Sequence, residues 1–259
     1  MPVHFNNGPF DGNFCSKYDS SFAIGIRQKS DIEAIAQFVP EQFEVIDDHI
    51  RWDYCDCHGI DYMAGGEYRI LQCVAFVRYT TKDGQQLDGD YPLVIFEDRF
   101  EPIRGGREDC GMPKLLCDIS TNRHVGNHWF AFSSMYSYPM IQMNFFEEGK
   151  VPDEIVKANT KKGFGNVFGV RCIPNIGKGG TAVNQTVLYP QKSDGDKDVW
   201  VGTGEVKLFV PEEKYWYTSP YYGIMSKLAS LPNYGFDSAI RSLGQLDLFC
   251  NGCQVLEEK

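Results

Sequence analysis

The sequence lacks the features that would direct it to a membrane or to nucleic acid. Nowhere do about 18 apolar residues follow one another, the length that a membrane-spanning helix needs. The first residues, MPVHFNN, have no basic segment followed by an apolar run, as a secretion signal has. Basic residues are few, because 25 Lys and Arg stand against 35 Asp and Glu, for a formal net charge of −10. We therefore expect a cytoplasmic protein that binds neither a membrane nor nucleic acid.

The sequence also lacks internal repeats and low-complexity linkers that would divide it into separate units. Its 259 residues fit one large domain, because β-barrels and sandwiches commonly reach this length as a single unit. Hydrophobic residues make up 42% and aromatic residues 14%, which is enough for a core around a pocket. We expect a single domain over residues 1–259, with residues 1–20 wrapping its surface.

The nine cysteines are an odd number at irregular spacings, and we expect mainly buried thiols. Cys55-Asp56-Cys57-His58 has metal-ligand residue types, but no second Cys/His pair follows at zinc-finger spacing. We favour a strand whose alternate residues pack inward, and we expect no metal. Cys250 and Cys253 have redox spacing but do not follow a strand in a βαβ unit, so we favour a mobile tail pair.

Most of the chain has the pattern of β-strands. Segments rich in Val, Ile, Tyr and Phe are separated by turn formers such as Lys82-Asp83-Gly84 and Asp88-Gly89-Asp90. The predicted strands are residues 22–28, 44–46, 50–57, 68–80, 91–97, 129–136, 140–145, 166–172, 182–187 and 199–209. Many strands at such spacing indicate a meandering antiparallel sheet, closed or nearly closed.

Three segments have helical features. In residues 30–39, Ser30 can cap a helix with Glu33 three residues later, and Pro40 stops it. The apolar residues of this segment fall on one helical face. Residues 221–231 and 236–243 are further candidate helices, before a last apolar stretch over residues 246–255.

The segment GGREDCGMPK, residues 105–114, carries the most specific pattern. It resembles the GRE-x-x-G-x-P-K signature of the acetoacetate decarboxylase-like superfamily, in which a Schiff-base lysine follows the proline. Residues 30–45, 173–175 and 200–208 resemble three further family segments in the same order, so the likeness covers nearly all of the chain after residue 20. It implies a mainly β (α+β) fold, an antiparallel β-barrel or cone with a few peripheral helices and an interior pocket.

The resemblance assigns imine formation to Lys114. The catalytic glutamate of the family aligns with Ile70, and Glu67 is the nearest acid, so we take Glu67 as the second catalytic candidate. The family's carboxylate-binding arginine falls near Ser21, with Arg27 six residues further along. Leu115 replaces the second of two consecutive lysines. These departures count against acetoacetate itself as the substrate.

A lysine attacks a ketone only as the free amine, and an ordinary lysine has a pKa of ~10.4. In acetoacetate decarboxylase the amine is activated by desolvation or by a neighbouring cation. We expect burial among apolar residues to favour the neutral amine, or Arg107 to supply positive potential. Glu108 could instead have a structural role, in an ion pair or in hydrogen bonds to the backbone of its turn. The residues that we expect around the substrate are Arg107, Glu108, Tyr68, Ile70, Met112 and Leu115.

A protonated imine is an electron sink, so the resemblance implies a carbon–carbon lyase of secondary metabolism. Its substrate would be a β-keto acid or polyketide-like carbonyl compound, and its reaction a decarboxylation or an imine-mediated aldol, dehydration or cyclisation reaction. We expect a small keto compound as the partner and no cofactor, since the imine replaces a borrowed electron sink. Family members are often homo-oligomers. The alternative is a non-covalent ligand-binding or cyclase-type barrel in which Lys114 forms no imine.

Overall fold

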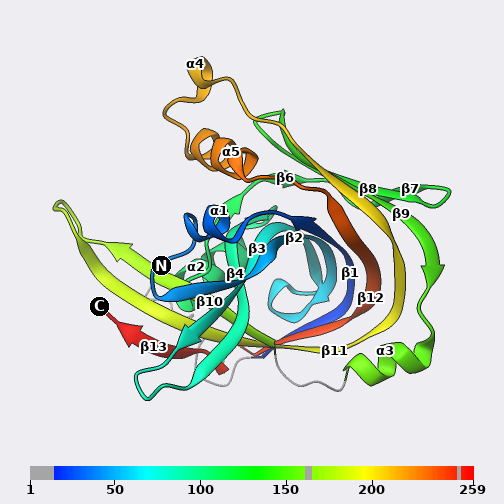
Figure 1. Ribbon diagram of the computed structural model, residues 1–259, viewed down its shortest axis with the longest axis horizontal. Helices are drawn as coiled ribbons and strands as arrows, with labels where there is room; N and C mark the ends of the chain where they lie inside the picture. The colour runs from blue at the N-terminus through cyan, green and yellow to red at the C-terminus, as the bar shows by residue number, and fades with distance from the viewer. Residues whose placement is uncertain (1–14, 161–164, 250–251) are drawn as a thin grey trace.

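The computed structural model describes residues 15–160, 165–249 and 252–259, and its main feature is one 13-stranded sheet (Figure 1). The strands are β1 Cys15–Lys29, β2 Phe43–Ile60, β3 Gly66–Thr80, β4 Gln86–Glu97, β5 Lys114–Leu116, β6 Asp118–Ile119, β7 Arg123–Val125, β8 His128–Met135, β9 Tyr138–Lys150, β10 Gly165–Pro174, β11 Thr181–Leu208, β12 Phe236–Phe249 and β13 Gln254–Glu258. The helices are α1 Ile32–Ala36, η2 Asp61–Met63, α2 Phe100–Cys110, α3 Asp153–Thr160, α4 Glu213–Trp216 and α5 Pro220–Ser230.

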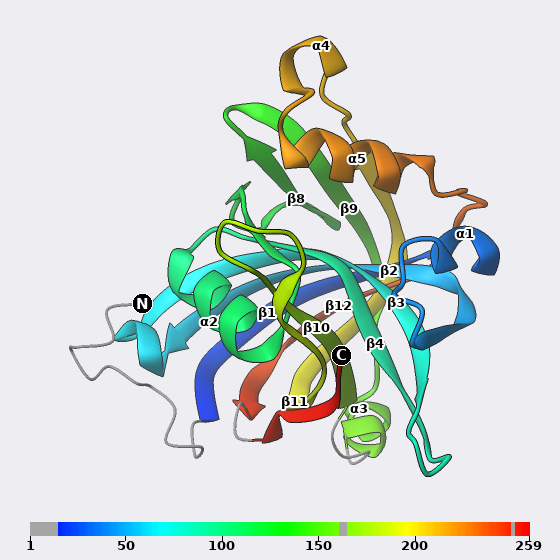
Figure 2. The same ribbon diagram turned by 90° about the vertical axis from the view of Figure 1, so that its left-hand side faces the viewer.

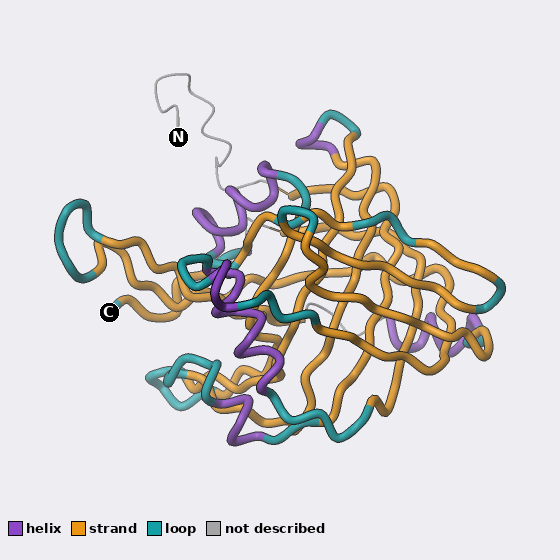
Figure 3. Tube along the Cα trace, turned by 90° about the horizontal axis from the view of Figure 1, so that it is seen from above, coloured by secondary structure: helices purple, strands orange, loops and turns teal. Residues whose placement is uncertain are grey.

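The strand pairings return to their starting point. The order runs β10, β4, β3, β2, β1, β12, β11, and β10 also pairs with β11. Most neighbours are antiparallel, but β10 meets β4 in parallel through the single pair Val167 and Asp90. The helices lie around this strand-rich body (Figure 3). The predicted fold class, a β-rich cone with peripheral helices, is confirmed.

Two further parts of the structure adjoin the strand ring. Beyond β11 the sheet continues through β9 and β8 to β6, and α4 and α5 lie at the same end of the molecule (Figure 1). Helix α2 lies across the ring (Figure 2), where it contacts β4, β5, β10 and β11. Because α2 leads directly to Lys114, this contact positions the segment with the most specific sequence pattern.

Alternating apolar residues hold the ring together. Ile24 and Ile26 of β1 and Trp52 and Tyr54 of β2 are fully or almost fully buried in the main core. Burial of side chains of this size stabilises a fold by about 1.5–3 kcal/mol each. The Trp52 indole N–H donates to the Gln28 side-chain oxygen at 3.0 Å, so its polar group is paired inside the core.

The structure joins several predicted strands and corrects others. Residues 44–46 and 50–57 form one strand, β2, and residues 182–187 and 199–209 form one strand, β11. The predicted turn Asp88-Gly89-Asp90 is wrong, since these residues lie inside β4. A Cβ atom on Gly89 would come within 2.5 Å of the Asn166 main-chain oxygen, so the glycine permits the close approach of β10.

Of the predicted helices, residues 221–231 are confirmed as α5, whereas residues 236–243 are wrong because they belong to β12. Strand β12 pairs with β1 on one side and β11 on the other, and this pairing overrides the local preference. The first helix is shorter than predicted, and its cap is Asp31, whose side chain accepts from the Ala34 N–H at 2.9 Å, and not Ser30. Helices α2 and α3 were not predicted.

The ends of the chain differ from the expectations. Residues 15–20 begin β1 and do not simply wrap the surface, while residues 1–14 lie outside the described residues. Residues 254–258 pair with β11, so the chain is held in the sheet directly after Cys253. The Sγ atom of Cys253 lies 3.7 Å from that of Cys110, and Cys250 lies outside the described residues. Cys55–His58 lie in β2, as predicted. None of the described helices has the length and apolar character to cross a membrane.

A buried ion cluster links β2, β3 and the residue after β4. Arg69 lies 3.2 Å from both Asp56 and Asp98 and 2.6 Å from Glu67, and its side chain is 7% exposed. We predict that Arg69→Met lowers the free energy of unfolding by about 3–5 kcal/mol, because it removes the buried cation that two buried carboxylates share. Urea unfolding measures this change.

The matched control is Arg78→Met, which removes the more exposed pair between Arg78 and Asp88. We expect it to change stability little, because exposed ion pairs contribute little. Equal losses in both variants would contradict a special contribution from the buried cluster.

Candidate active site

A cavity of about 460 Å³ lies between the ring strands and α2. One face of β3 supplies Tyr68, Ile70, Gln72 and Val74, which are two residues apart and so point to the same side of the strand. Helix α2 covers the cavity with residues between Phe100 and Cys110. The predicted interior pocket is therefore present, and α2 is an additional wall.

Lys114 enters this cavity from β5. The strand runs parallel to β4, with Lys114 opposite Ile95, and the Ile95 N–H donates to the Pro113 oxygen at 3.0 Å. The Lys114 side chain then passes across α2 at Gly106. A Cβ atom there would lie 2.3 Å from Cε of Lys114, so any larger residue would displace the lysine side chain from this path.

The end of α2 explains another glycine of the pattern. Gly111 has a φ of 68°, the left-handed conformation that ends many helices, and its N–H donates to the Gly106 oxygen. A Cβ atom on Gly111 would also lie 2.6 Å from the main-chain nitrogen of Arg171. The signature thus ends the helix, turns the chain and delivers the lysine.

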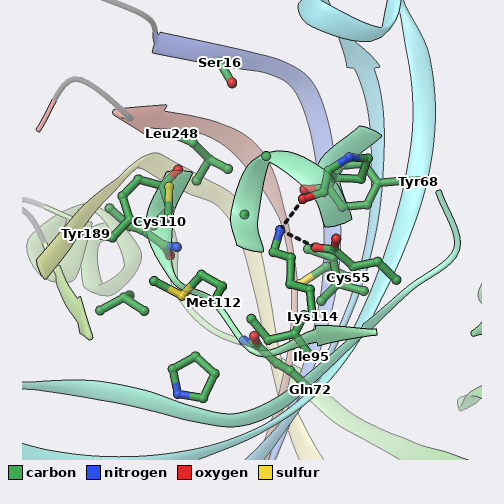
Figure 4. A pocket seen from close by; sticks show the side chains of 18 of the residues that line it. Ser16, Cys55, Tyr68, Gln72, Ile95, Cys110, Met112, Lys114, Tyr189 and Leu248 are labelled. Atoms are coloured by element: carbon green, nitrogen blue, oxygen red, sulfur yellow. Dashed lines mark hydrogen bonds and ion pairs between the residues drawn. The ribbon is translucent and has the colours of Figure 1, made fainter. Parts of the chain in front are cut away.

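The amine of Lys114 meets a buried carboxylate. Its Nζ atom lies 2.7 Å from Oε1 of Glu97 and donates to the Pro102 oxygen at 3.1 Å, and Figure 4 marks both contacts with dashed lines. The lysine side chain is 13% exposed and the glutamate side chain 0%. Burial raises the pKa of Glu97, and the nearby Lys114 ammonium opposes part of that rise. The pair thus consists of an amine at the cavity and an acid that holds its proton tightly.

Three tyrosines lie on the same wall. The hydroxyl groups of Tyr18 and Tyr68 are 3.0 Å apart, and Tyr62 also lines the cavity. Burial is the main cause that raises the pKa of Tyr68 well above its ordinary value, and the charge of Glu97 adds to the rise. These phenols therefore act as neutral hydrogen-bonding groups.

The structure brings half of the predicted substrate contacts to the cavity. Tyr68, Ile70 and Met112 line it together with Lys114 (Figure 4 shows Tyr68, Met112 and Lys114). Leu115 does not line it, because neighbouring strand residues face opposite sides, and it packs against the main core.

Three predicted polar residues lie outside this lining. Glu67 is 44% exposed on the opposite face of β3 from Tyr68, where it pairs with Arg69 and His58. The Glu108 side chain lies 3.5 Å from Arg104 and is 43% exposed, which matches its alternative structural role. The guanidinium of Arg107 donates to the main-chain oxygen of Lys114 at 3.0 Å, so it holds the backbone and does not face the amine.

Sequence reasoning missed Glu97, which is the acid beside the lysine. Glu97 of β4 stands directly opposite Ile70 of β3, the position with which the family's catalytic glutamate aligns. The cavity therefore has a carboxylate on the neighbouring strand. A register shift between the pairs Cys73–Val94 and Val74–Pro92 leaves Leu93 as an extra residue. Such a bulge changes which residues face inward, and no local pattern in residues 86–97 indicates it.

Comparison with known proteins agrees with this geometry. The family model described as acetoacetate decarboxylase (ADC) matches residues 1–220. The chain therefore belongs to the acetoacetate decarboxylase family, and it is a decarboxylase-like lyase. An acetoacetate decarboxylase of Burkholderia cenocepacia is 27% identical over 191 residues, which are 73% of this chain and 72% of the relative.

Solved structures show the same fold at lower identity. Acetoacetate decarboxylase from Legionella pneumophila has a TM-score of 0.75 and 19% identity, over 95% of this chain and 88% of that one. The enduracididine biosynthesis enzyme MppR, complexed with pyruvate, has a TM-score of 0.70 and 13% identity, over 95% and 91%.

We predict that Gly106→Ala reduces the capture of a keto compound by Lys114 at least about tenfold, as measured by borohydride reduction and mass spectrometry. The new methyl group would occupy the place of the lysine side chain. Alanine in a helix interior otherwise stabilises it by about 1 kcal/mol relative to glycine. Loss of capture in a folded protein is thus the expected result.

The control is Gly105→Ala in the same helix, whose Cβ atom would make an ordinary contact of 3.7 Å with Asp109. We expect it to keep most of the capture. If Gly106→Ala forms as much keto-compound adduct on Lys114 as Gly105→Ala does, the described path of the Lys114 side chain is wrong.

The raised pKa of Glu97 predicts a pH dependence of stability. Above pH ~4.3, the usual glutamate pKa, the native protein keeps a proton that the unfolded chain has released. Wild-type stability should therefore fall with rising pH relative to Glu97→Gln, by at most about 1.4 kcal/mol per pH unit. Urea unfolding of both proteins between pH 4.5 and 7 measures the difference, and a wild-type gain over this range would contradict the raised pKa.

Proposed function

We propose that Lys114 forms an imine with a β-keto acid or polyketide-like carbonyl compound, which the protein then cleaves, dehydrates or cyclises. The observation that carries this proposal is the Lys114–Glu97 contact of 2.7 Å at the wall of a 460 Å³ cavity. A cavity of this size accepts a small organic molecule. The family assignment supports a lyase, and the residues of the cavity support lysine chemistry.

The pair offers a source of free amine without a second cation. Transfer of one proton from the Lys114 ammonium to Glu97 turns a buried ion pair into a neutral amine and a neutral carboxylic acid. Burial favours this exchange, because desolvation disfavours both charged forms. The expected neighbouring cation is thus replaced by a neighbouring carboxyl group.

The proton on Glu97 also serves the following step. The Lys114 nitrogen attacks the carbonyl carbon and gives a carbinolamine with a hydroxyl group. Glu97 donates its proton to that hydroxyl, water leaves, and an iminium ion and a carboxylate remain. The ion pair is restored with the substrate carbon attached, so atoms and charges balance.

Related structures support carbonyl compounds as ligands of this fold. MppR has been solved with pyruvate and with the condensation product of pyruvate and imidazole 4-carboxaldehyde. These ligands belong to that enzyme, which shares 12–13% of its sequence with this chain. They support a proposal of carbonyl chemistry and do not specify a substrate.

One observation favours a second candidate function, a cavity that binds its ligand without an imine. The Lys114 amine has two partners, Glu97 and the Pro102 oxygen, and an ion pair that stays charged would keep it unreactive. In that case Lys114 would only hold α2 against β4.

Borohydride reduction in the presence of a keto compound distinguishes the two functions. We expect a covalent adduct on Lys114, located by peptide mass spectrometry, and its loss in Lys114→Ala. The control Lys150→Ala removes a half-exposed lysine paired with Asp153 and Asp198 and should keep the adduct. A protein that binds the ligand and gives no adduct on Lys114 would support the non-covalent function.

A further inference from the structure

The cationic side chains of the cavity are already paired. Among the described residues that line it, the cations are Arg51, Arg104 and Lys114. Arg51 lies 2.9 Å from Asp53 and 2.7 Å from Asp90, and Lys114 lies 2.7 Å from Glu97.

Arg104 is shared between two carboxylates. Its Nη1 atom lies 3.5 Å from Oε2 of Glu108, and its charge also acts on Asp109. The lining therefore presents no cation that lacks an acidic neighbour within the described part of the chain. Arg27, the arginine nearest to the expected carboxylate-binding position, does not line the cavity and pairs with Asp47 at 2.9 Å.

The same lining is rich in carboxyl groups. Asp90, Glu97, Glu101 and Asp109 all contribute to it. Asp109 is notable because its Oδ2 atom is buried and has no hydrogen-bond partner among the described residues. A buried carboxylate oxygen without a hydrogen-bond donor adds to the negative potential at this wall of the cavity.

Formation of the imine does not release a cation for the substrate. The iminium nitrogen carries the charge that the ammonium carried before, and Glu97 remains its counterion. A substrate carboxylate would then be an unpaired anion in a buried site that already holds several acids, which is strongly unfavourable.

We propose that the substrate of Lys114 is a neutral carbonyl compound, and that Asp109 selects against substrates with a carboxylate. This inference rests on the proposed function and narrows it. Decarboxylation is then not the reaction. The imine instead promotes removal of a proton from the carbon next to the carbonyl, and the bond changes that follow from it.

Two nearly isosteric probes test the charge selection. Acetoacetate carries a carboxylate where acetoacetamide carries an amide, and only the amide is neutral and donates hydrogen bonds. Each is titrated against the full chain with borohydride, and the modified fraction of Lys114 is measured by mass spectrometry. Adducts with and without the carboxylate are counted together, and labelling of N-acetyl-lysine in the same mixture corrects for intrinsic reactivity.

We expect acetoacetamide to reach half-maximal labelling at a concentration at least about tenfold lower than acetoacetate, the scale of one unscreened like charge within several ångströms. Equal labelling, or better labelling by acetoacetate, would overturn the charge selection and leave the imine in place. No adduct on Lys114 with either probe would overturn both the inference and the proposed function.

Asp109→Asn tests the assigned residue. It keeps the size of the side chain and removes its charge, so the preference for the amide should fall about threefold or more. Asp83→Asn, in the exposed turn between β3 and β4, is the matched control and should leave the preference unchanged. An unchanged preference in Asp109→Asn would show that Asp109 does not select the substrate.

Discussion

The site depends on the ion pair between Lys114 and Glu97, which is almost completely removed from water. An isolated charge at either position would be unfavourable, so each residue requires the other or a shared proton. The pair also joins two segments that α2 separates in the sequence, the end of β4 and the start of β5. One contact of 2.7 Å therefore holds the end of β4 and the start of β5 together at the cavity wall.

The rest of the fold keeps this contact in place. The Lys114 side chain passes α2 at Gly106, and Gly111 turns the chain so that β5 can lie parallel to β4. Beside the pair, the hydroxyl groups of Tyr18 and Tyr68 from the ring strands β1 and β3 lie 3.0 Å apart on the same wall. Because the neighbouring cations are paired, the proposed imine would form in a cavity whose charged lining is mainly acidic. The family signature identifies the lysine, and the surrounding side chains determine which compounds can contact it.

The sequence predicted the fold class and the position of Lys114 because both depend on local patterns. Alternating apolar residues identified most strands, and the resemblance of residues 105–114 to the family signature pointed to Lys114. The error at residues 236–243 arose because strand pairing on two sides cannot be read from one segment. Glu97 was missed for a related reason. Its inward direction depends on the bulge at Leu93 and on its register with Ile70, both of which are properties of paired strands.

The central claim is that Glu97 holds a proton more tightly than an ordinary glutamate while it contacts the amine of Lys114. Carbon-13 NMR of protein labelled at the glutamate carboxyl groups tests it most directly, with the Glu97 signal assigned by its loss in Glu97→Gln. We expect this carboxyl group to titrate above the usual glutamate pKa of ~4.3, because it is buried. A titration at or below that value would contradict the account, because Glu97 could not then receive the proton that frees the amine.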